Sequence, residues 1–173
     1  VGSLAEAGGS LEECKKLGDK VNKNSGSMGV ALTSCSVPAA GKPNFEIGDD
    51  EMEFGVGIHG EPGRRRDKIK SAQEITSELL EAINEDLKPE SNEEILLFVN
   101  GMGGTPLTEL YLIFDNAKNV LDKKNIKISR SLVGNYCTSL EMQGVSITLT
   151  KLDEELVKHW DSSVLTAAMR WGM

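Results

Sequence analysis

Apolar positions in the first third of the chain follow first a helical and then a strand-like spacing. Ser10-Leu-Glu-Glu13 has the form of a capping box and predicts a helix that stops near Gly26. Residues 28–35 are rich in small and branched apolar side chains and precede a turn-rich segment at 38–43. This pattern is typical of a strand that enters a loop.

The segment from Glu51 to His59 shows strict alternation of apolar and other positions. One face of the predicted strand has Met52, Phe54, Val56 and Ile58. The other face has Glu53, Gly55, Gly57 and His59. The apolar face predicts burial, whereas glycines on the second face allow another group to approach the backbone closely. We therefore expect His59 at the end of a strand, where α/β domains expose ligand-binding groups.

The rest of the chain predicts three helices and three strands. They are a helix over 71–87, a buried strand over 95–99, a helix that Thr105 caps and Pro106 begins, strands near 126–136 and 145–149, and a short helix capped by Asp153. Interleaved helices and strands with short and long connections predict an α/β domain. We expect a mixed sheet of about five to six strands with helices packed on it.

Composition and charge narrow the class of protein. A length of 173 residues with 39% hydrophobic content is typical of one domain, residues 1–173. The net charge of −8 argues against nucleic acid as a partner, because phosphate binding needs clustered cations. Arg64–Arg66 are the local exception, and a solvated loop is favoured over an acidic partner or phosphate site. Apolar runs fall short of the ~20 residues that span a membrane, and no signal segment is seen.

The three cysteines are odd in number and widely spaced, at Cys14, Cys35 and Cys137. This spacing predicts neither a disulfide framework nor a metal site. We expect buried or half-buried packing roles and a reduced, cytoplasmic setting.

Candidate chemistry centres on two histidines. His59, flanked by glycines, could reach a small polar substrate, and a half-buried histidine with one hydrogen bond fits its spacing equally well. No Cys, Asp or second His stands at metal-ligand spacing from it, so we expect no metal site. His159, beside Trp160 in the last predicted helix, is interpreted as structural.

Two further segments have competing interpretations. The loop 101–105 could present backbone N–H groups to an anion at a helix start, but a tight structural turn is favoured because no complete phosphate-binding motif is present. The acidic cluster Asp49, Asp50, Glu51 and Glu53 could bind a divalent cation, and a solvated strand edge explains it more simply.

Several motifs together resemble one known family. They include Gly-Ile-His-Gly-Glu-Pro-Gly at 57–63, Gly-Gly-Thr-Pro-Leu-Thr-Glu-Leu-Tyr at 103–111 and Asn-Tyr-Cys-Thr-Ser-Leu at 135–140. On these residues the chain resembles the substrate-binding (K) subunit of dihydroxyacetone kinases. The resemblance implies the second domain of that subunit's fold, in a carboxy-terminal portion whose amino-terminal half is absent.

The same resemblance implies roles for residues and partners. His59 would attack the C2 carbonyl of dihydroxyacetone and hold it as a covalent hemiaminal, with Gly57 and Gly60 beside the substrate. A nucleotide-binding (L) subunit or domain would supply the phosphoryl group, with ATP or ADP and Mg²⁺ held there and no cofactor in this chain. A homodimer is also implied.

The absent half would contain the other substrate contacts, so the resemblance implies that this portion alone is inactive. The end of the chain favours the form that depends on a phosphotransferase system over a form fused to its own ATP-binding domain. The alternatives are a non-catalytic relative that senses dihydroxyacetone and controls transcription, or an inactive fragment that serves as a scaffold.

Overall fold

A computed structural model of the protein describes residues 1–59, 61 and 63–172. Helices and strands are interleaved along the chain. In order they are α1 (Gly2–Glu6), α2 (Leu11–Lys23), β1 (Ser25–Ala31), β2 (Ser36–Val37), β3 (Lys42–Pro43), β4 (Glu51–Phe54), β5 (Arg65–Lys68), α3 (Ala72–Leu87), β6 (Glu94–Gly101), α4 (Leu107–Lys123), β7 (Lys127–Gly134), β8 (Gly144–Lys151), α5 (Glu154–Trp160), β9 (Val164–Leu165) and β10 (Arg170–Trp171).

Six strands form one mixed sheet in the order β5-β4-β1-β8-β6-β7. The pair β6 and β7 is parallel and is joined through α4, whereas the other neighbouring pairs are antiparallel. The predicted α/β class with a mixed sheet of five to six strands is confirmed. The strands predicted over 95–99, 126–136 and 145–149 correspond to β6, β7 and β8.

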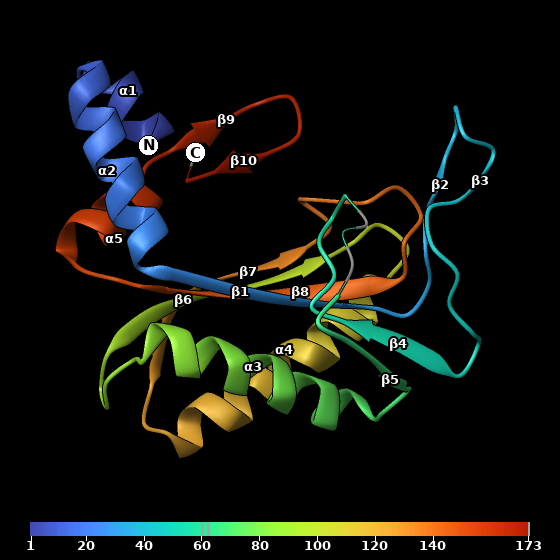
Figure 1. Ribbon diagram of the computed structural model, residues 1–173. Coiled ribbons are helices and arrows are strands. Elements are labelled where there is room, and N and C mark those ends of the chain that lie inside the picture. Colours follow the sequence, from blue (N-terminus) through green and yellow to red (C-terminus); the bar gives the residue numbers. More distant parts are fainter. Residues whose placement is uncertain (60, 62, 173) are drawn as a thin grey trace.

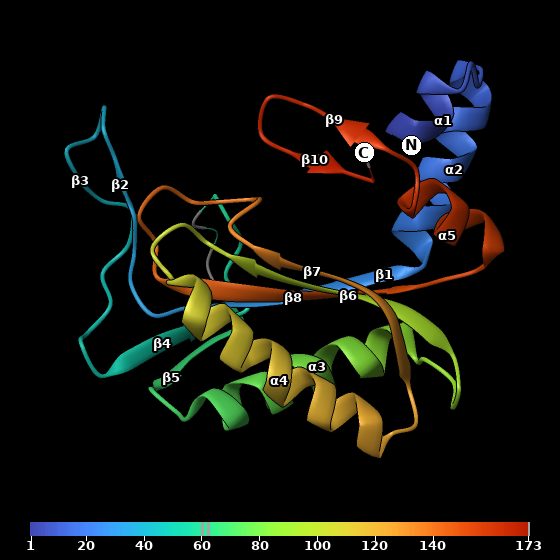
Figure 2. The same ribbon diagram turned by 180° about the vertical axis from the view of Figure 1, so that it is seen from behind.

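The main core lies between the sheet and the pair of helices α3 and α4, which cover one face (Figures 1 and 2). Alternation along β8 directs Val145, Ile147 and Leu149 into this core. Gly26 in β1 faces the same way, because a Cβ there would lie 3.2 Å from Ile83 Cγ2. On the opposite face, the Ser27 and Thr148 hydroxyls are 2.6 Å apart and exposed.

A smaller core lies on that second face, under the loop between β4 and β5. It contains Ala31, Cys35, Val56, Met102 and Met142, with Phe45 packed against it. The β4–β5 loop rises on this side of the sheet, away from α3 and α4, in both ribbon views (Figures 1 and 2). The two cores therefore lie on opposite faces of the sheet.

Capping signals predicted the helix starts at Ser10 and Asp153, and apolar periodicity predicted the start at Ser71. Ser10 and Ser71 each form a capping box with the glutamate three residues on, and Asp153 accepts a hydrogen bond from Leu156 N at 3.0 Å. These starts are confirmed. The first of these helices ends at Lys23, earlier than expected, and Gly26 belongs to β1.

The strand predicted from Glu51 to His59 is wrong beyond Phe54. Gly55 has a φ of 84°, a left-handed conformation that bends the chain out of the strand. Its N–H donates to Gly29 O at 2.7 Å, so β1 fixes the bend. The alternation of apolar residues in the sequence continues to Val56 although the strand has ended. Val56 is apolar because it is buried in the smaller core.

The start of α4 also differs from the prediction. Pro106 is the cap and Leu107 the first helical residue. Thr105 does not cap the helix, because its buried hydroxyl donates to Gly144 O at 2.7 Å and accepts from Gly144 N at 2.8 Å. The side chain that was expected to cap α4 joins the turn before α4 to β8 instead.

The arginine run interpreted as a solvated loop lies largely in a strand. Arg65 and Arg66 belong to β5, which pairs with β4. The Arg65 guanidinium lies 4.2 Å from the ring centroid of Phe54, a cation–π contact that holds its stem against the sheet. Arg64 N donates to Phe54 O at 2.7 Å.

The cysteines differ in their surroundings. Cys35 is buried and Cys14 half-buried, as expected, but the prediction is wrong for Cys137, which is exposed. Cys137 is fixed through its backbone: its N–H donates to the buried side chain of Asn100, and its C=O accepts from the same side chain. Its thiol can therefore lie at the surface. Among the helices of the described residues, none is long and apolar enough to cross a membrane.

Candidate functional site

The connection between β4 and β5, residues 55–64, is called the His59 loop. Its two ends are held together by Arg64 N, which donates to Phe54 O at 2.7 Å, and by Gly63 N, which donates to Glu53 Oε1 at 3.1 Å. β4 in turn pairs with β1. The described part of the loop is thus anchored at its base to a strand in the interior of the sheet.

Glycines permit the tight approach at the base of the His59 loop. A Cβ on Gly63 would lie 2.6 Å from Phe54 O. A Cβ on Gly29 of β1 would lie 3.2 Å from Val56 O and 2.8 Å from Met102 Cε. A side chain at Gly63 would clash with the backbone at the base of the loop, and one at Gly29 would crowd the Val56 carbonyl and Met102.

His59 lies on the surface of this loop. Its side chain is 81% exposed, so the interpretation as a half-buried histidine is wrong. Its Nδ1 is 3.0 Å from Glu61 Oε1, and its backbone N–H donates to Glu61 Oε2 at 3.1 Å. The imidazole is therefore accessible and oriented by one neighbouring carboxylate.

Glu61 is the residue at this site that the motif analysis did not single out. Hydrogen bonding lowers the pKa of its carboxyl group, first through its own backbone N–H and then through the side chain and backbone of His59, while partial burial opposes the shift. The carboxylate is thus held in its charged form beside the ring. The sequence signal that could have identified Glu61 is a carboxylate two residues after a histidine, within a glycine-rich segment.

Gly57 has a steric relation to the same carboxylate. A Cβ on Gly57 would lie 2.2 Å from Glu61 Oε2, a distance that no side chain could accept without movement. Gly57 therefore provides the space in which Glu61 lies. Gly60, the second glycine predicted beside the substrate, is outside the described residues.

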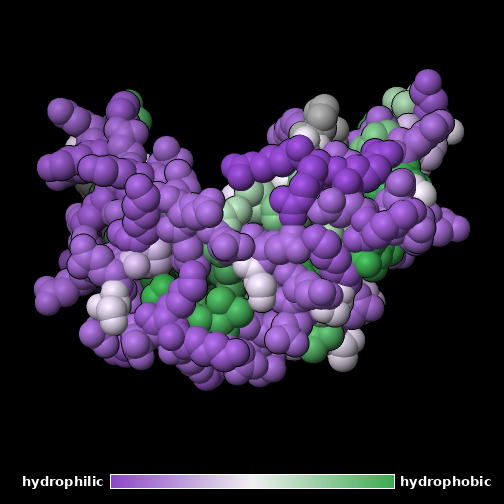
Figure 3. All heavy atoms as spheres, turned by 60° about the horizontal axis from the view of Figure 1, so that its bottom comes forward, coloured by the Kyte–Doolittle hydropathy of each residue, from purple (hydrophilic) through white to green (hydrophobic). Residues whose placement is uncertain are grey.

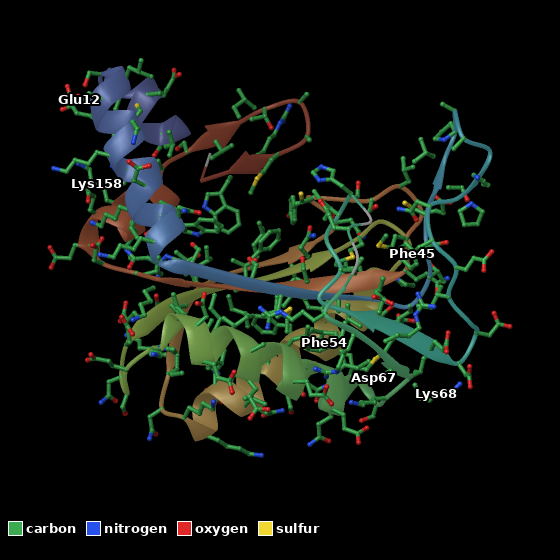
Figure 4. The ribbon with its side chains drawn as sticks, in the orientation of Figure 1. Glu12, Phe45, Phe54, Asp67, Lys68 and Lys158 are labelled. Carbon is green, nitrogen blue, oxygen red and sulfur yellow. The ribbon has the colours of Figure 1, made fainter. Side chains whose placement is uncertain are left out.

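The acidic cluster at 49–53 is neutralised largely by β5. Asp50 pairs with Lys68 at 2.5 Å and Glu53 with Arg66 at 2.9 Å. The Lys68 ammonium lowers the pKa of Asp50. Figure 4 labels Phe54, Asp67 and Lys68 on the strands β4 and β5, in whose register Lys68 lies opposite Glu51. Because β5 is the edge strand, Glu51 and Glu53 lie on an inner strand, whereas Asp49 and Asp50 lie in the turn before it.

The loop 101–105 uses its backbone donors within the protein. Gly103 N donates to Asn135 Oδ1 at 3.1 Å, and Gly104 N donates to Met142 O at 2.9 Å. Gly103 has a φ of 119°, and a Cβ there would lie 1.8 Å from Leu140 O. These contacts confirm the interpretation as a tight structural turn.

The remaining candidate features do not join the His59 loop. His159 Nδ1 lies 2.9 Å from Ser3 Oγ, which links α5 to α1. A cavity of about 300 Å³ opens on the α3–α4 face, and its lining includes Val30, Ile69, Glu109 and Leu112. Figure 3 shows hydrophobic groups reaching the surface on this side of the molecule. Within residues 1–59, 61 and 63–172, no cluster of His, Cys, Asp or Glu could hold a metal ion.

The fold and the site define a class: an α/β domain with a mixed sheet that presents one histidine in a glycine-rich loop between two strands. The chain belongs to the Dak1 domain family, whose model matches residues 1–168. The resemblance found in the sequence motifs is thereby confirmed.

Individual relatives agree with this assignment. The dihydroxyacetone-binding subunit DhaK of a PTS-dependent dihydroxyacetone kinase from Listeria innocua is 46% identical over 155 residues, covering 90% of this chain and 47% of the relative. A solved dihydroxyacetone kinase operon co-activator has a TM-score of 0.85 and 31% identity, over 92% of this chain and 50% of that one. The C. freundii dihydroxyacetone kinase has a TM-score of 0.79 and 25% identity, over 97% and 31%.

The chain spans about half the length of the curated relatives that it matches. The structural neighbours confirm the fold of the dihydroxyacetone kinase K subunit.

Proposed function

We propose that this chain is the histidine-bearing portion of a dihydroxyacetone-binding subunit and that it holds dihydroxyacetone for phosphorylation. The observation that supports this most directly is the exposed imidazole of His59, bonded to Glu61 in a loop anchored to the sheet. The names of the relatives supply the substrate and the kinase reaction.

The proposed chemistry begins with addition to a carbonyl group. A lone pair on the His59 imidazole attacks C2 of dihydroxyacetone, and the π electrons of the carbonyl move to its oxygen, which takes up a proton. The product is a hemiaminal with a new bond between nitrogen and carbon. Glycerol has no carbonyl group, so this step selects short ketones and aldehydes by their chemistry.

Phosphoryl transfer would then depend on a second component. A nucleotide-binding subunit or domain is proposed to hold ATP or ADP with Mg²⁺ and to pass a phosphoryl group to a hydroxyl of the captured substrate. Covalent capture fixes the acceptor, which suits a transfer that depends on positioning and charge stabilisation. The proposed setting is a cytoplasmic homodimer, and the free cysteines are compatible with a reducing compartment.

A second candidate function is the sensing of dihydroxyacetone without phosphorylation. Its support is the likeness to the operon co-activator, at a TM-score of 0.85. Both functions could use His59, so capture alone does not separate them. Formation of dihydroxyacetone phosphate by the complete subunit with its nucleotide-binding partner would favour the kinase, and its absence would favour the sensor.

Capture can be tested by intact-protein mass spectrometry after incubation with dihydroxyacetone and rapid desalting. We expect a gain of one substrate mass in the wild-type chain and in His159→Ala, the matched control at the other histidine, and none in His59→Ala. A gain that persists in His59→Ala would contradict the proposal. A gain seen only when the missing half is supplied would keep His59 as the nucleophile and place essential contacts in that half.

A further inference from the structure

We infer that Glu61 is a positioning residue that sets the tautomer of His59, and that Gly57 provides the space for its carboxylate. The inference rests on the proposed role of His59 as a nucleophile. It concerns two residues of the loop that act on the ring and not on the substrate.

Two hydrogen bonds give the first argument. One carboxylate oxygen of Glu61 lies 3.0 Å from the ring nitrogen Nδ1, and the other accepts from the backbone N–H of His59 at 3.1 Å. Both oxygens are thus used on the same residue. This arrangement restricts the side chain of Glu61 relative to the backbone from which the ring projects.

The chemistry of the acceptor determines which nitrogen holds the proton. A carboxylate has only lone pairs to offer, so Nδ1 must be the N–H donor for the 3.0 Å contact to be favourable. The alternative tautomer would place the Nδ1 lone pair against a carboxylate oxygen. Glu61 therefore selects the Nδ1–H form, which leaves the nucleophilic lone pair on Nε2.

The same contact assists the addition step. When Nε2 bonds to a carbonyl carbon, the ring becomes positively charged, with its proton on Nδ1. The Glu61 carboxylate stabilises this charge, and loss of the Nδ1 proton leaves a neutral hemiaminal. One proton leaves the ring and one is taken up by the carbonyl oxygen, so the step is balanced without an oxidant or reductant.

Exposure of the ring makes this positioning necessary. A side chain that is 81% exposed has little packing to select one rotamer. The Glu61 contact supplies the restraint that burial supplies elsewhere. Gly57 completes it, because a Cβ only 2.2 Å from Glu61 Oε2 would displace the carboxylate.

The tautomer can be measured directly by long-range ¹H–¹⁵N NMR of the imidazole rings. The chain has only two histidines, so His159→Ala assigns both sets of signals. At about pH 8.5, where an ordinary imidazole is neutral, we expect His59 to be mainly Nδ1–H in the wild type. In Glu61→Ala it should shift toward Nε2–H, while Glu61→Gln, whose amide oxygen still accepts, should keep much of the Nδ1–H form. An unchanged tautomer in Glu61→Ala would overturn the inference.

A double-substitution cycle tests the part assigned to Gly57. Gly57→Ala should shift the His59 tautomer in the same direction as Glu61→Ala. In the Glu61→Ala background, the added Gly57→Ala should change the tautomer little, because the carboxylate that it displaces is already gone. Equal, additive effects of Gly57→Ala in both backgrounds would contradict the steric role.

Capture of dihydroxyacetone separates this inference from the proposed function. We expect the rate of capture to fall about tenfold or more in Glu61→Ala, as loss of an orienting carboxylate behind a histidine costs in other enzymes, and less in Glu61→Gln. If the tautomer of His59 depends on Glu61 but the complete subunit captures no dihydroxyacetone, only the proposed function is overturned. Capture at the wild-type rate in Glu61→Ala would overturn the positioning role and leave the proposed function standing.

Discussion

At the scale of single residues, Thr105 shows how one buried hydroxyl joins two segments. It lies in the turn between β6 and α4, and it bonds both to the N–H and to the C=O of Gly144 at the start of β8. Gly144 is closely packed, since a Cβ there would lie 2.5 Å from Val30 O. Both residues are buried, so the loss of a hydrogen bond between them is costly.

Thr105→Val is expected to destabilise the protein by about 1–3 kcal/mol, because it leaves the buried Gly144 N–H without a partner. Thr105→Ser keeps the hydroxyl and is the matched control. Urea denaturation followed by tryptophan fluorescence would measure both. Equal stability of the two variants would show that these hydrogen bonds contribute little.

At the scale of elements, α5 is attached to α2 through its own cap. Asp153 accepts from Leu156 N at 3.0 Å and pairs with Lys20 of α2 at 2.5 Å. Lys20 also pairs with Glu155 at 2.5 Å. The Lys20 ammonium and then the Leu156 N–H lower the pKa of Asp153.

Asp153→Ala should cost about 1 kcal/mol at neutral pH because it removes the cap, whereas Asp153→Asn keeps a capping oxygen and should cost less. A carboxyl group whose pKa is lower in the folded than in the unfolded state stabilises the fold at any pH above its unfolded-state pKa. This stabilisation is lost as the pH falls through the folded-state pKa. The stability gap between wild type and Asp153→Asn should therefore close in acid. Urea titrations at about pH 7 and about pH 3 would test this, and a gap that widens in acid would contradict it.

Element starts were predictable from sequence where the signal is local. Ser10, Ser71 and Asp153 bond to backbone groups of their own first turn, so a few neighbouring residues decide the outcome. The end of β4 was not predictable in this way. It depends on the bond from Gly55 N to Gly29 O, which belongs to a different strand, while the apolar alternation runs on through Val56.

For the candidate site, the sequence predicted the key residue but not its surroundings. His59 was identified from its motif and its glycine neighbours. Its exposure and its contact with Glu61 depend on the path of the chain after Gly55, which alternation alone cannot give. Gly57 was expected to leave room for a substrate, and the space beside it is occupied by the Glu61 carboxylate.

At the scale of the whole molecule, the chain is proposed to be one portion of a longer kinase subunit. It spans about half the length of its curated relatives. Within the described residues, the His59 loop is set apart from the apolar cavity on the α3–α4 face, whose lining residues come from other segments. None of the described residues that line this cavity belongs to the His59 loop.

We expect this chain alone to form no dihydroxyacetone phosphate, because the other proposed substrate contacts and the nucleotide are absent from it. A coupled dehydrogenase assay with ATP and Mg²⁺ would measure the product. Addition of the proposed amino-terminal half and of the proposed nucleotide-binding partner should give activity with the wild-type chain and none with His59→Ala. Turnover by the 173-residue chain in isolation would refute this expectation.

The strand order has a consequence for the time course of folding. The hairpin that bears His59 reaches the rest of the sheet only through β1, and the other neighbour of β1 is β8. Ser27 and Thr148, which face each other in that pair, are 121 positions apart in the chain. Closing so large a loop is slow compared with forming the nearby unit β6-α4-β7. During synthesis on the ribosome, His59 is made before β8, so the pairing of β1 with β8 can form only after the His59 loop has been made.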